Sequence, residues 1–145
     1  MTTVVVLGGG PDRPALIALP PGATVIAADG GAELARAFGL RVELAVGDFD
    51  SISAETLGSA ARVERHPPDK DATDLELALS AAQQRGVDEI VVVGGAGGRL
   101  DHFLANVMLL GSSALADTQV SARLGEAEAV VVRDSTELHG RTGDL

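Results

Sequence analysis

Short runs of β-branched and aliphatic residues alternate along the chain with stretches that have a helical pattern. Strands joined by helices form a parallel sheet that is covered on both faces, and such strands are almost continuously apolar. The alternation therefore predicts an α/β fold. The predicted strands are Val4–Leu7, Thr24–Ala28, Leu44–Val46, Arg62–His66, Ile90–Val93 and Gln119–Leu124.

The segments between these runs contain residues that begin and end helices. Ser53 can cap a helix, and Thr73 followed by Glu76 forms a capping box. Gly39 is placed to end the helix that precedes it. The predicted helices are Arg13–Leu19, Ala32–Phe38, a helix from Ser53 to about Ala60, one from Thr73 to Arg85, and Leu100–Leu110.

The composition excludes several classes of site and of binding partner. The absence of cysteine excludes a disulfide scaffold, a Cys-ligated zinc site and an iron–sulfur cluster. A net charge of −10 argues against a nucleic-acid binder but allows a small phosphate ligand carried by Mg²⁺. No apolar run is long enough to span a bilayer, and the N-terminus does not resemble a signal peptide. We therefore expect a cytoplasmic protein with no membrane partner.

The end of the chain has a different pattern. The run Ala129–Arg133 is predicted to be a strand, but no helix connects it to the strand that ends at Leu124. The polar residues after it have no clear helical period. We therefore expect one domain over residues 1–125 and the beginning of a second, β-rich unit over residues 126–145.

Polar residues follow the predicted strands at the points where the strands end. In an open parallel sheet, ligands bind beyond the carboxyl ends of the strands. These ends carry Asp29, then Asp48 and Asp50, then Asp69 and Asp71, and finally Arg99, Asp101 and His102. Their convergence predicts a single site at this edge of the sheet.

The sharpest of these groups is Asp48-Phe49-Asp50. In an extended segment, residues i and i+2 point the same way, so both carboxylates would face the cleft while Phe49 turns to the core. Paired carboxylates are hard oxygen ligands that suit Mg²⁺. The alternative is a solvated turn in which an aspartate caps a helix.

A second group lies before the capping box. Asp71 could add a third carboxylate and Lys70 could meet a phosphate. Aspartate and threonine are also ordinary residues at the start of a helix, and Asp74 in the first turn suits the helix dipole. Thr73 is expected to be a cap.

The third group is the glycine loop Gly94–Gly98 with Arg99. A glycine loop that leads into a helix presents backbone N–H groups to an anion, and Arg99 would add a forked donor. The alternative is a flexible turn with a surface arginine. His102 and Asn106 lie on the helix that follows, where a hydrogen-bonding role in the structure is equally open.

Other common motifs do not fit. The run Gly8-Gly9-Gly10 suggests a dinucleotide fingerprint, but Arg13 stands where the third glycine belongs. The chain has neither a P-loop nor a Gly-x-Ser-x-Gly elbow.

Four motifs in order resemble the thiamine pyrophosphokinase (thiamine diphosphokinase) family. They cover roughly residues 4–124 and are Ala28-Asp29-Gly30-Gly31-Ala32, Gly47-Asp48-Phe49-Asp50-Ser51-Ile52, Lys70-Asp71-Ala72-Thr73-Asp74-Leu75-Glu76 and Gly97-Gly98-Arg99-Leu100-Asp101-His102. The resemblance implies a Rossmann-like catalytic domain, a homodimer, and transfer of diphosphate from Mg-ATP to thiamine with release of AMP.

The resemblance also implies roles for individual residues. Asp48, Asp50 and Asp71 resemble the Mg²⁺-binding carboxylates, and together with Asp29 they form the expected catalytic set. The expected nucleotide-binding residues are Lys70, Thr73, Asp74, Gly97, Gly98, Arg99, Asp101 and His102.

The family carries a second, mostly β domain that supplies part of the thiamine cleft. The resemblance therefore predicts that residues 126–145 are its truncated beginning, and it supports ATP binding better than thiamine binding. Two alternatives stay open: a pyrophosphokinase with another acceptor, such as a pterin, and a non-catalytic nucleotide-binding module.

Overall fold

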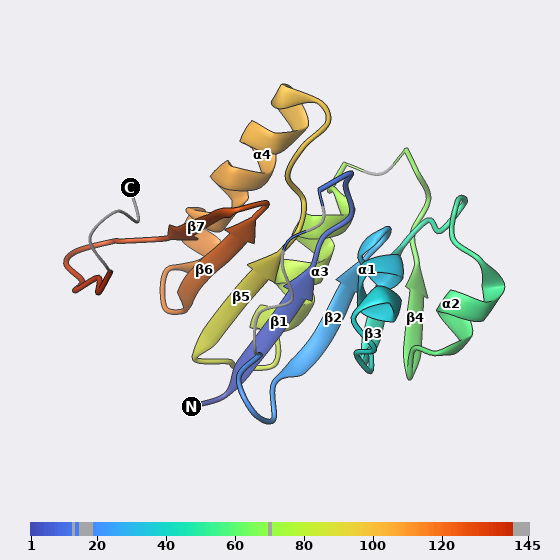
Figure 1. Ribbon diagram of the computed structural model, residues 1–145, viewed down its shortest axis with the longest axis horizontal. Coiled ribbons are helices and arrows are strands. Elements are labelled where there is room, and N and C mark those ends of the chain that lie inside the picture. The colour runs from blue at the N-terminus through green and yellow to red at the C-terminus, as the bar shows by residue number, and fades with distance from the viewer. Residues whose placement is uncertain (13, 15–18, 70, 141–145) are drawn as a thin grey trace.

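A computed structural model describes residues 1–12, 14, 19–69 and 71–140. In this part of the chain the strands form one sheet with the order β4-β3-β2-β1-β5-β6-β7 (Figure 1). The strands are β1 (Thr3–Leu7), β2 (Thr24–Ala28), β3 (Leu44–Gly47), β4 (Arg62–Arg65), β5 (Glu89–Val93), β6 (Gln119–Leu124) and β7 (Ala127–Val130). The helices are α1 (Gly31–Ala37), α2 (Ala54–Gly58), α3 (Asp74–Gln83), α4 (Leu100–Leu110) and a short 3₁₀ turn, η1 (Ser113–Leu115).

The central strands are parallel and buried on both faces. β1 lies in the middle of the sheet, with β2 on one side and β5 on the other, and every residue of β1 is buried. A strand covered on both faces has no polar side, which explains why its sequence is Thr-Val-Val-Val-Leu rather than an alternating pattern. The predicted α/β fold with a parallel sheet is confirmed.

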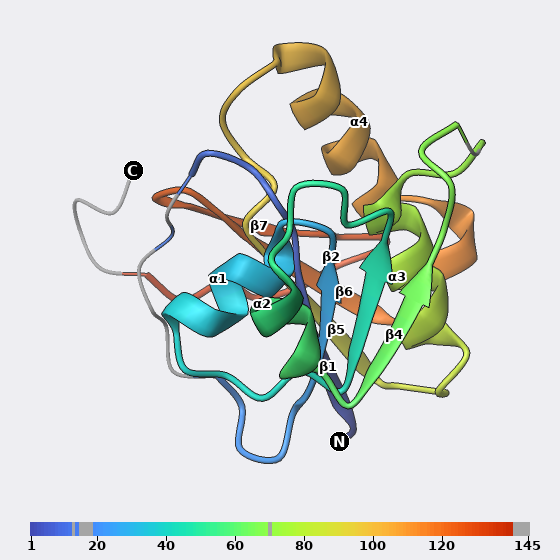
Figure 2. The same cartoon turned by 90° about the vertical axis from the view of Figure 1, so that its right-hand side faces the viewer.

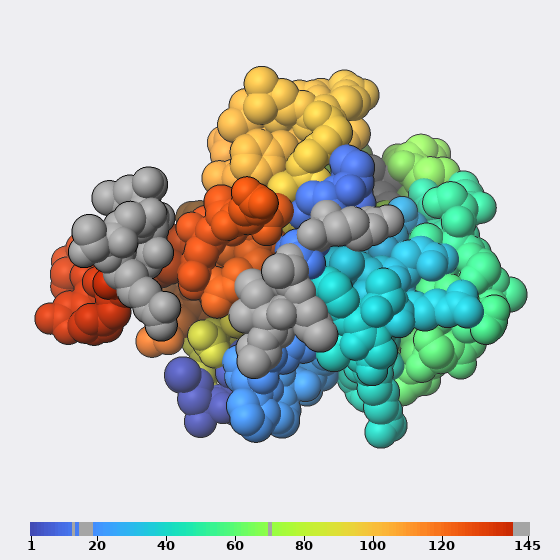
Figure 3. Space-filling model, in the orientation of Figure 1, coloured from blue at the N-terminus to red at the C-terminus, as the bar shows by residue number. Residues whose placement is uncertain are grey.

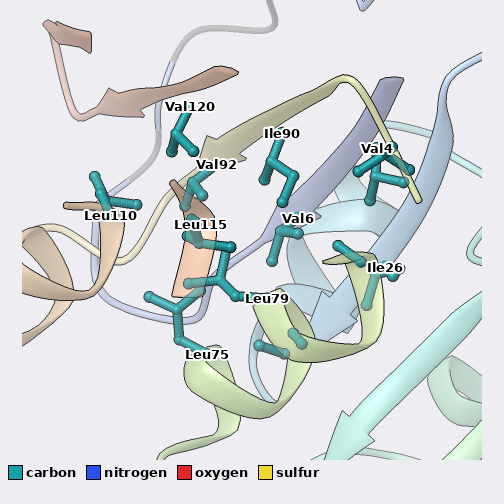
Figure 4. Close-up of a cluster of buried hydrophobic side chains, with 14 of the residues drawn as sticks. Val4, Val6, Ile26, Leu75, Leu79, Ile90, Val92, Leu110, Leu115 and Val120 are labelled. Carbon is teal, nitrogen blue, oxygen red and sulfur yellow. The ribbon is translucent and has the colours of Figure 1, made fainter. Parts of the chain in front are cut away.

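Each face of the sheet has its own hydrophobic core. Val4, Val6, Ile90 and Val92 point to the face that is covered by α3 and the end of α4 (Figure 4). Val5, Leu7 and their neighbours point to the opposite face, which is covered by α1 and α2 (Figure 2). Because successive side chains of a strand point to opposite faces, one apolar run contributes to both cores.

The predicted caps are present. The side chain of Ser53 accepts a hydrogen bond from the amide of Thr56 at the start of α2. Thr73 accepts one from the amide of Glu76 at 3.1 Å at the start of α3. Gly39 follows α1 with a φ of 65°, as a residue that ends a helix often does. The predicted helix Arg13–Leu19 lies largely outside the described residues.

The last strand differs from the prediction. β7 covers Ala127–Val130 instead of Ala129–Arg133, and it pairs antiparallel with β6 in the same sheet. A turn at Gly125, with a φ of 62°, reverses the chain, so no connecting helix is needed. The division of the chain at residue 125 into two domains stays a prediction.

Within the described residues, no helix combines the length and apolar character that crossing a membrane requires.

Candidate functional site

The order of the strands reverses at β1. The chain builds β2, β3 and β4 on one side of β1 and then returns to place β5 and β6 on the other. In such a sheet, ligands bind beyond the carboxyl ends of the strands at the point where the strand order reverses. The loop after β1 (residues 8–12) and the loop after β5 (residues 94–99) flank this point. The carboxylates after β2 and β3 lie next to it.

Asp29 is held in a strained but well-supported position at the end of β2. Its φ of 41° is left-handed, and its amide donates a hydrogen bond to the carbonyl of Val46 at 2.8 Å. Its Oδ1 accepts a hydrogen bond from the amide of Phe49 at 3.3 Å. Non-glycine residues with positive φ are uncommon, and aspartate and asparagine tolerate the conformation best. These contacts fix the Asp29 carboxyl against the loop that follows β3.

Phe49 turns into the core, as predicted, but the backbone around it is not extended as expected. It is buried beside α1 and α2, and its φ of 60° shows that the segment is a left-handed turn and not an extended strand. The carboxylate of Asp48 accepts a hydrogen bond from the amide of Asp50 at 3.0 Å. The turn that was the alternative explanation of this motif is therefore present. It leaves Asp48 half-buried and Asp50 exposed.

Negative charge is concentrated around Asp29. Burial raises the pKa of Asp29, and repulsion from the carboxylates of Asp74 and Asp48 raises it further. The hydrogen bond from the Phe49 amide acts in the opposite direction without cancelling these effects. Carboxylates from the ends of β2 and β3 and from the start of α3 thus lie near enough for their charges to interact, and we call Asp29, Asp48 and Asp74 the anionic cluster.

The cluster fits a divalent cation by its donor chemistry and its charge. Carboxylate oxygens are the ligands that Mg²⁺ prefers, and a cation would relieve the repulsion that raises the pKa of Asp29. Among the described residues, however, no group of three or more His, Cys, Asp or Glu side chains is close enough to hold a metal ion. The assignment of Asp48, Asp50 and Asp71 as metal ligands stays a prediction.

The segment before α3 contributes less to the described site. Asp71 is exposed, and Lys70 lies outside the described residues. Thr73 caps α3, so the structural role expected for it is confirmed. Asp74 lies close enough to Asp29 to influence its charge and is more than a helix-start residue. No observation tests nucleotide binding by these residues.

The arginine after the glycine loop is already engaged. Arg99 forms two hydrogen bonds to the Asp101 carboxylate, at 3.1 and 2.6 Å, and both side chains are exposed. This contact lowers the pKa of Asp101 below its ordinary value. To bind a phosphate, Arg99 must release the Asp101 carboxylate or divide its N–H donors between Asp101 and the phosphate. His102, Gly97 and Gly98 are exposed at the same end of α4.

Two side chains hold the glycine loop, and one of them was not predicted. Asn106 of α4 donates a hydrogen bond to the carbonyl of Gly95 at 3.1 Å, a structural role left open by the sequence. Asp12 accepts a hydrogen bond from the amide of Ala96 at 3.1 Å. Sequence reasoning missed Asp12, whose partner lies 84 residues away.

Asparagine at position 29 is expected to make the folded chain more stable at neutral pH. Its Oδ1 can still accept the Phe49 hydrogen bond and its backbone tolerates positive φ, while repulsion from Asp74 and Asp48 ends. Because folding raises the pKa of Asp29, the ionised carboxylate destabilises the folded state at pH values above that raised pKa. The stability that Asp29→Asn gains over the wild type therefore disappears as the pH falls below the ordinary aspartate pKa of about 3.9.

After allowance for solvent screening, Asp29→Asn should raise the free energy of unfolding at pH 7 by at most about 1 kcal/mol, which corresponds to about 2–4 °C in Tm. Thermal unfolding of both proteins at pH 7 and at low pH measures it. Asp117→Asn removes one charge from an exposed turn and should leave Tm unchanged. A lower Tm for Asp29→Asn at pH 7 would show that the carboxylate stabilises the fold.

A doubly wound sheet with a glycine loop at its switch point and acidic loops beside it defines a class of α/β domains that bind ligands at the carboxyl ends of their strands. Within this class, the model of "Thiamin pyrophosphokinase, catalytic domain" matches residues 21–122. The chain belongs to the thiamin pyrophosphokinase family, and the resemblance seen in its four motifs is confirmed.

Individual relatives agree. The chain is 37% identical over 120 residues to the thiamine pyrophosphokinase of Bacillus subtilis (strain 168). It resembles the crystal structure of the B. subtilis thiamine pyrophosphokinase with a TM-score of 0.71 and 30% identity over 83% of the chain. A thiamin pyrophosphokinase family protein from Enterococcus faecalis gives a TM-score of 0.69 and 32% identity over 84% of the chain.

The match covers only part of these relatives. It includes 76% of this chain and 55% of the curated B. subtilis protein. It includes 60% and 61% of the two solved chains. The activity and substrates of the whole relatives are therefore proposals for this chain.

Proposed function

We propose that this chain forms the catalytic domain of a thiamine diphosphokinase, which transfers diphosphate from Mg-ATP to the hydroxyl of thiamine. The match of residues 21–122 to the catalytic domain of this family carries the proposal. The anionic cluster around Asp29, at the carboxyl ends of β2 and β3, supports it. Family membership favours thiamine over a pterin as the acceptor.

The chemistry asks for positioning and charge neutralisation. The hydroxyl oxygen of thiamine attacks the β-phosphorus of ATP, the bond from that phosphorus to the oxygen bridging the α-phosphorus breaks, and AMP leaves while the hydroxyl proton passes to solvent or a base. Such transfers depend mostly on alignment and electrostatics. Mg²⁺, when bound, would neutralise phosphate charge.

Residues of the chain would hold the cation and position the nucleotide. Asp29, Asp48, Asp50 and Asp71 are proposed to bind the cation and face the reacting groups. Lys70, Thr73, Asp74, Gly97, Gly98, Arg99, Asp101 and His102 are proposed to form the nucleotide side of the site. Arg99 is suited to this role because its planar fork can exchange the Asp101 carboxylate for a phosphate.

Release of AMP from Mg-ATP, with and without thiamine, tests the proposal. The assay uses this 145-residue chain and a version continued through any downstream reading frame. Thiamine-dependent AMP from either form supports the function. If ATP binds but no AMP forms in either, a non-catalytic nucleotide-binding module is favoured. If AMP forms only with a hydroxymethyl pterin, the acceptor is wrong.

We also propose that the protein is a cytoplasmic homodimer. Large apolar side chains lie exposed on α4, which stands out from the rest of the molecule (Figure 3). Leu100, Leu104 and Met108 are 69%, 51% and 76% exposed and recur at a spacing of four along one side of the helix. A contiguous apolar surface of this kind is typical of interaction sites.

A second copy fits this surface by charge. Asp101 lies at the start of α4, and Arg133 donates hydrogen bonds to the carbonyls of Gly111 and Ser112 just beyond its end. Antiparallel packing of two α4 helices would bring Asp101 close to the partner's Arg133. It would also set opposite ends of the helix dipoles side by side.

Glutamate at position 104 is expected to weaken self-association by about 10-fold or more, because it places a charge in the apolar contact. Light scattering after size exclusion, over a dilution series, measures the effect. Gln84→Glu adds the same charge at an exposed position just after α3 and should leave the dimer unchanged. A monomeric wild-type chain would refute the proposal, and so would a Leu104→Glu protein that dimerises normally.

A further inference from the structure

The loops after β1 and β5 are packed backbone against backbone. A Cβ on Gly94 would lie 2.7 Å from the carbonyl oxygen of Gly8, and a Cβ on Gly8 would lie 3.2 Å from the amide nitrogen of Gly95. Real Cβ atoms essentially never approach another heavy atom to within 3.0 Å, so Gly94 has no room for a side chain. The shape of the glycine loop thus depends on the loop that follows β1.

Asp12 lies at the end of that β1 loop and bridges two distant segments. Its Oδ1 accepts a hydrogen bond from the amide of Ala96 at 3.1 Å, and its Oδ2 accepts one from the amide of Gly125 at 3.3 Å. These two partners are 84 and 113 residues away in the sequence. One carboxylate therefore ties together the loops at the carboxyl ends of β1, β5 and β6.

The bridge decides which amides of the glycine loop can face a ligand. The amide of Ala96 is bound to Asp12, and the amide of Gly94 donates to the carbonyl of Arg123 at 3.0 Å. Among the described residues, no hydrogen bond occupies the amides of Gly97 and Gly98, and both glycines are exposed. Backbone N–H groups with no protein partner at the start of a helix are suited to phosphate oxygens.

We propose that Asp12 is a positioning residue that shapes residues 94–98 for the phosphates of the nucleotide; this inference rests on the proposed function. A carboxylate suits the task because both of its oxygens accept hydrogen bonds. An asparagine has one acceptor, and its amide N–H group would face the N–H of Ala96 or Gly125.

Asp12→Asn tests the inference, with Asp117→Asn as a control that removes the same charge from an exposed turn. Calorimetry gives the Kd of Mg-ATP and of adenosine, which lacks phosphates. Deuterium exchange reports on residues 94–98. For Asp12→Asn we expect the Kd of ATP to rise about 10-fold, the Kd of adenosine to stay within twofold, and exchange in the loop to increase. The control should match the wild type in all three.

Other outcomes overturn the inference. Unchanged ATP affinity, equal losses for ATP and adenosine, or failure of Asp12→Asn to fold by circular dichroism would leave Asp12 with no role or with a purely structural one. Absence of ATP binding by the wild-type chain is a different result, because it removes the proposed function. In that case the exchange data still decide whether Asp12 holds the loop, and unchanged exchange would refute that as well.

Discussion

Replacing Asp48 by asparagine is expected to lower Mg²⁺-dependent ATP binding and turnover by at least about 100-fold, as the loss of one preorganised electrostatic group often does. Asparagine keeps the side-chain oxygen that accepts the hydrogen bond from Asp50, so the turn should survive. What the substitution removes is one negative charge from the cluster around Asp29. The expected loss is therefore a loss of cation binding and not of local structure.

Calorimetric titration of Mg-ATP, at several concentrations of free Mg²⁺, separates these two effects. Asp48→Asn should need more Mg²⁺ to bind ATP, and excess Mg²⁺ should partly rescue it. Asp48→Ala removes the turn acceptor as well and should lose some stability in addition. If Asp48→Asn binds Mg-ATP like the wild type while Asp48→Ala does not, the carboxylate only forms a turn and the metal assignment is wrong.

Much of the sheet could be predicted because its signals are local. Runs such as Thr24–Ala28 and Gln119–Leu124 have the bounds that their composition indicates, and the caps at Ser53 and Thr73 depend on residues three positions away. β7 could not be placed in the same way. Its pairing with β6 follows from a turn at Gly125, and the prediction instead assigned this region to a new unit.

In the candidate site, too, local features could be predicted from the sequence, whereas contacts between distant segments could not. Asp29, Asp48 and Asp74 were singled out because each follows a strand or starts a helix, and in the structure the charges of Asp48 and Asp74 influence that of Asp29. The left-handed turn at Phe49 and the bridge from Asp12 depend on contacts between segments far apart in the sequence. Asp12 lies between Pro11 and Pro14, just after a run of glycines. Nothing in this local sequence indicates that its carboxylate will accept a hydrogen bond from Ala96.

Alanine at position 31 is expected to destabilise the folded chain by about 3 kcal/mol or more, a large fraction of the stability of a typical domain. Gly31 is the first residue of α1, and a Cβ there would lie 2.0 Å from the carbonyl oxygen of Leu7. Leu7 is fully buried at the end of the central strand and cannot move aside without disturbing both cores. The helix must therefore shift away from β1.

Urea unfolding measures the effect through the midpoint and the slope of the transition. Gly58→Ala is the matched control, since no heavy atom lies within 4 Å of its Cβ in α2, and it should be neutral or stabilising by about 0.5 kcal/mol. A Gly31→Ala protein within 1 kcal/mol of the wild type would show that α1 can move freely. The expected loss would instead mean that Gly31 is required by the close packing of α1 on β1. That packing also places Gly30 against Gly9, and so sets the position from which Asp29 faces the site.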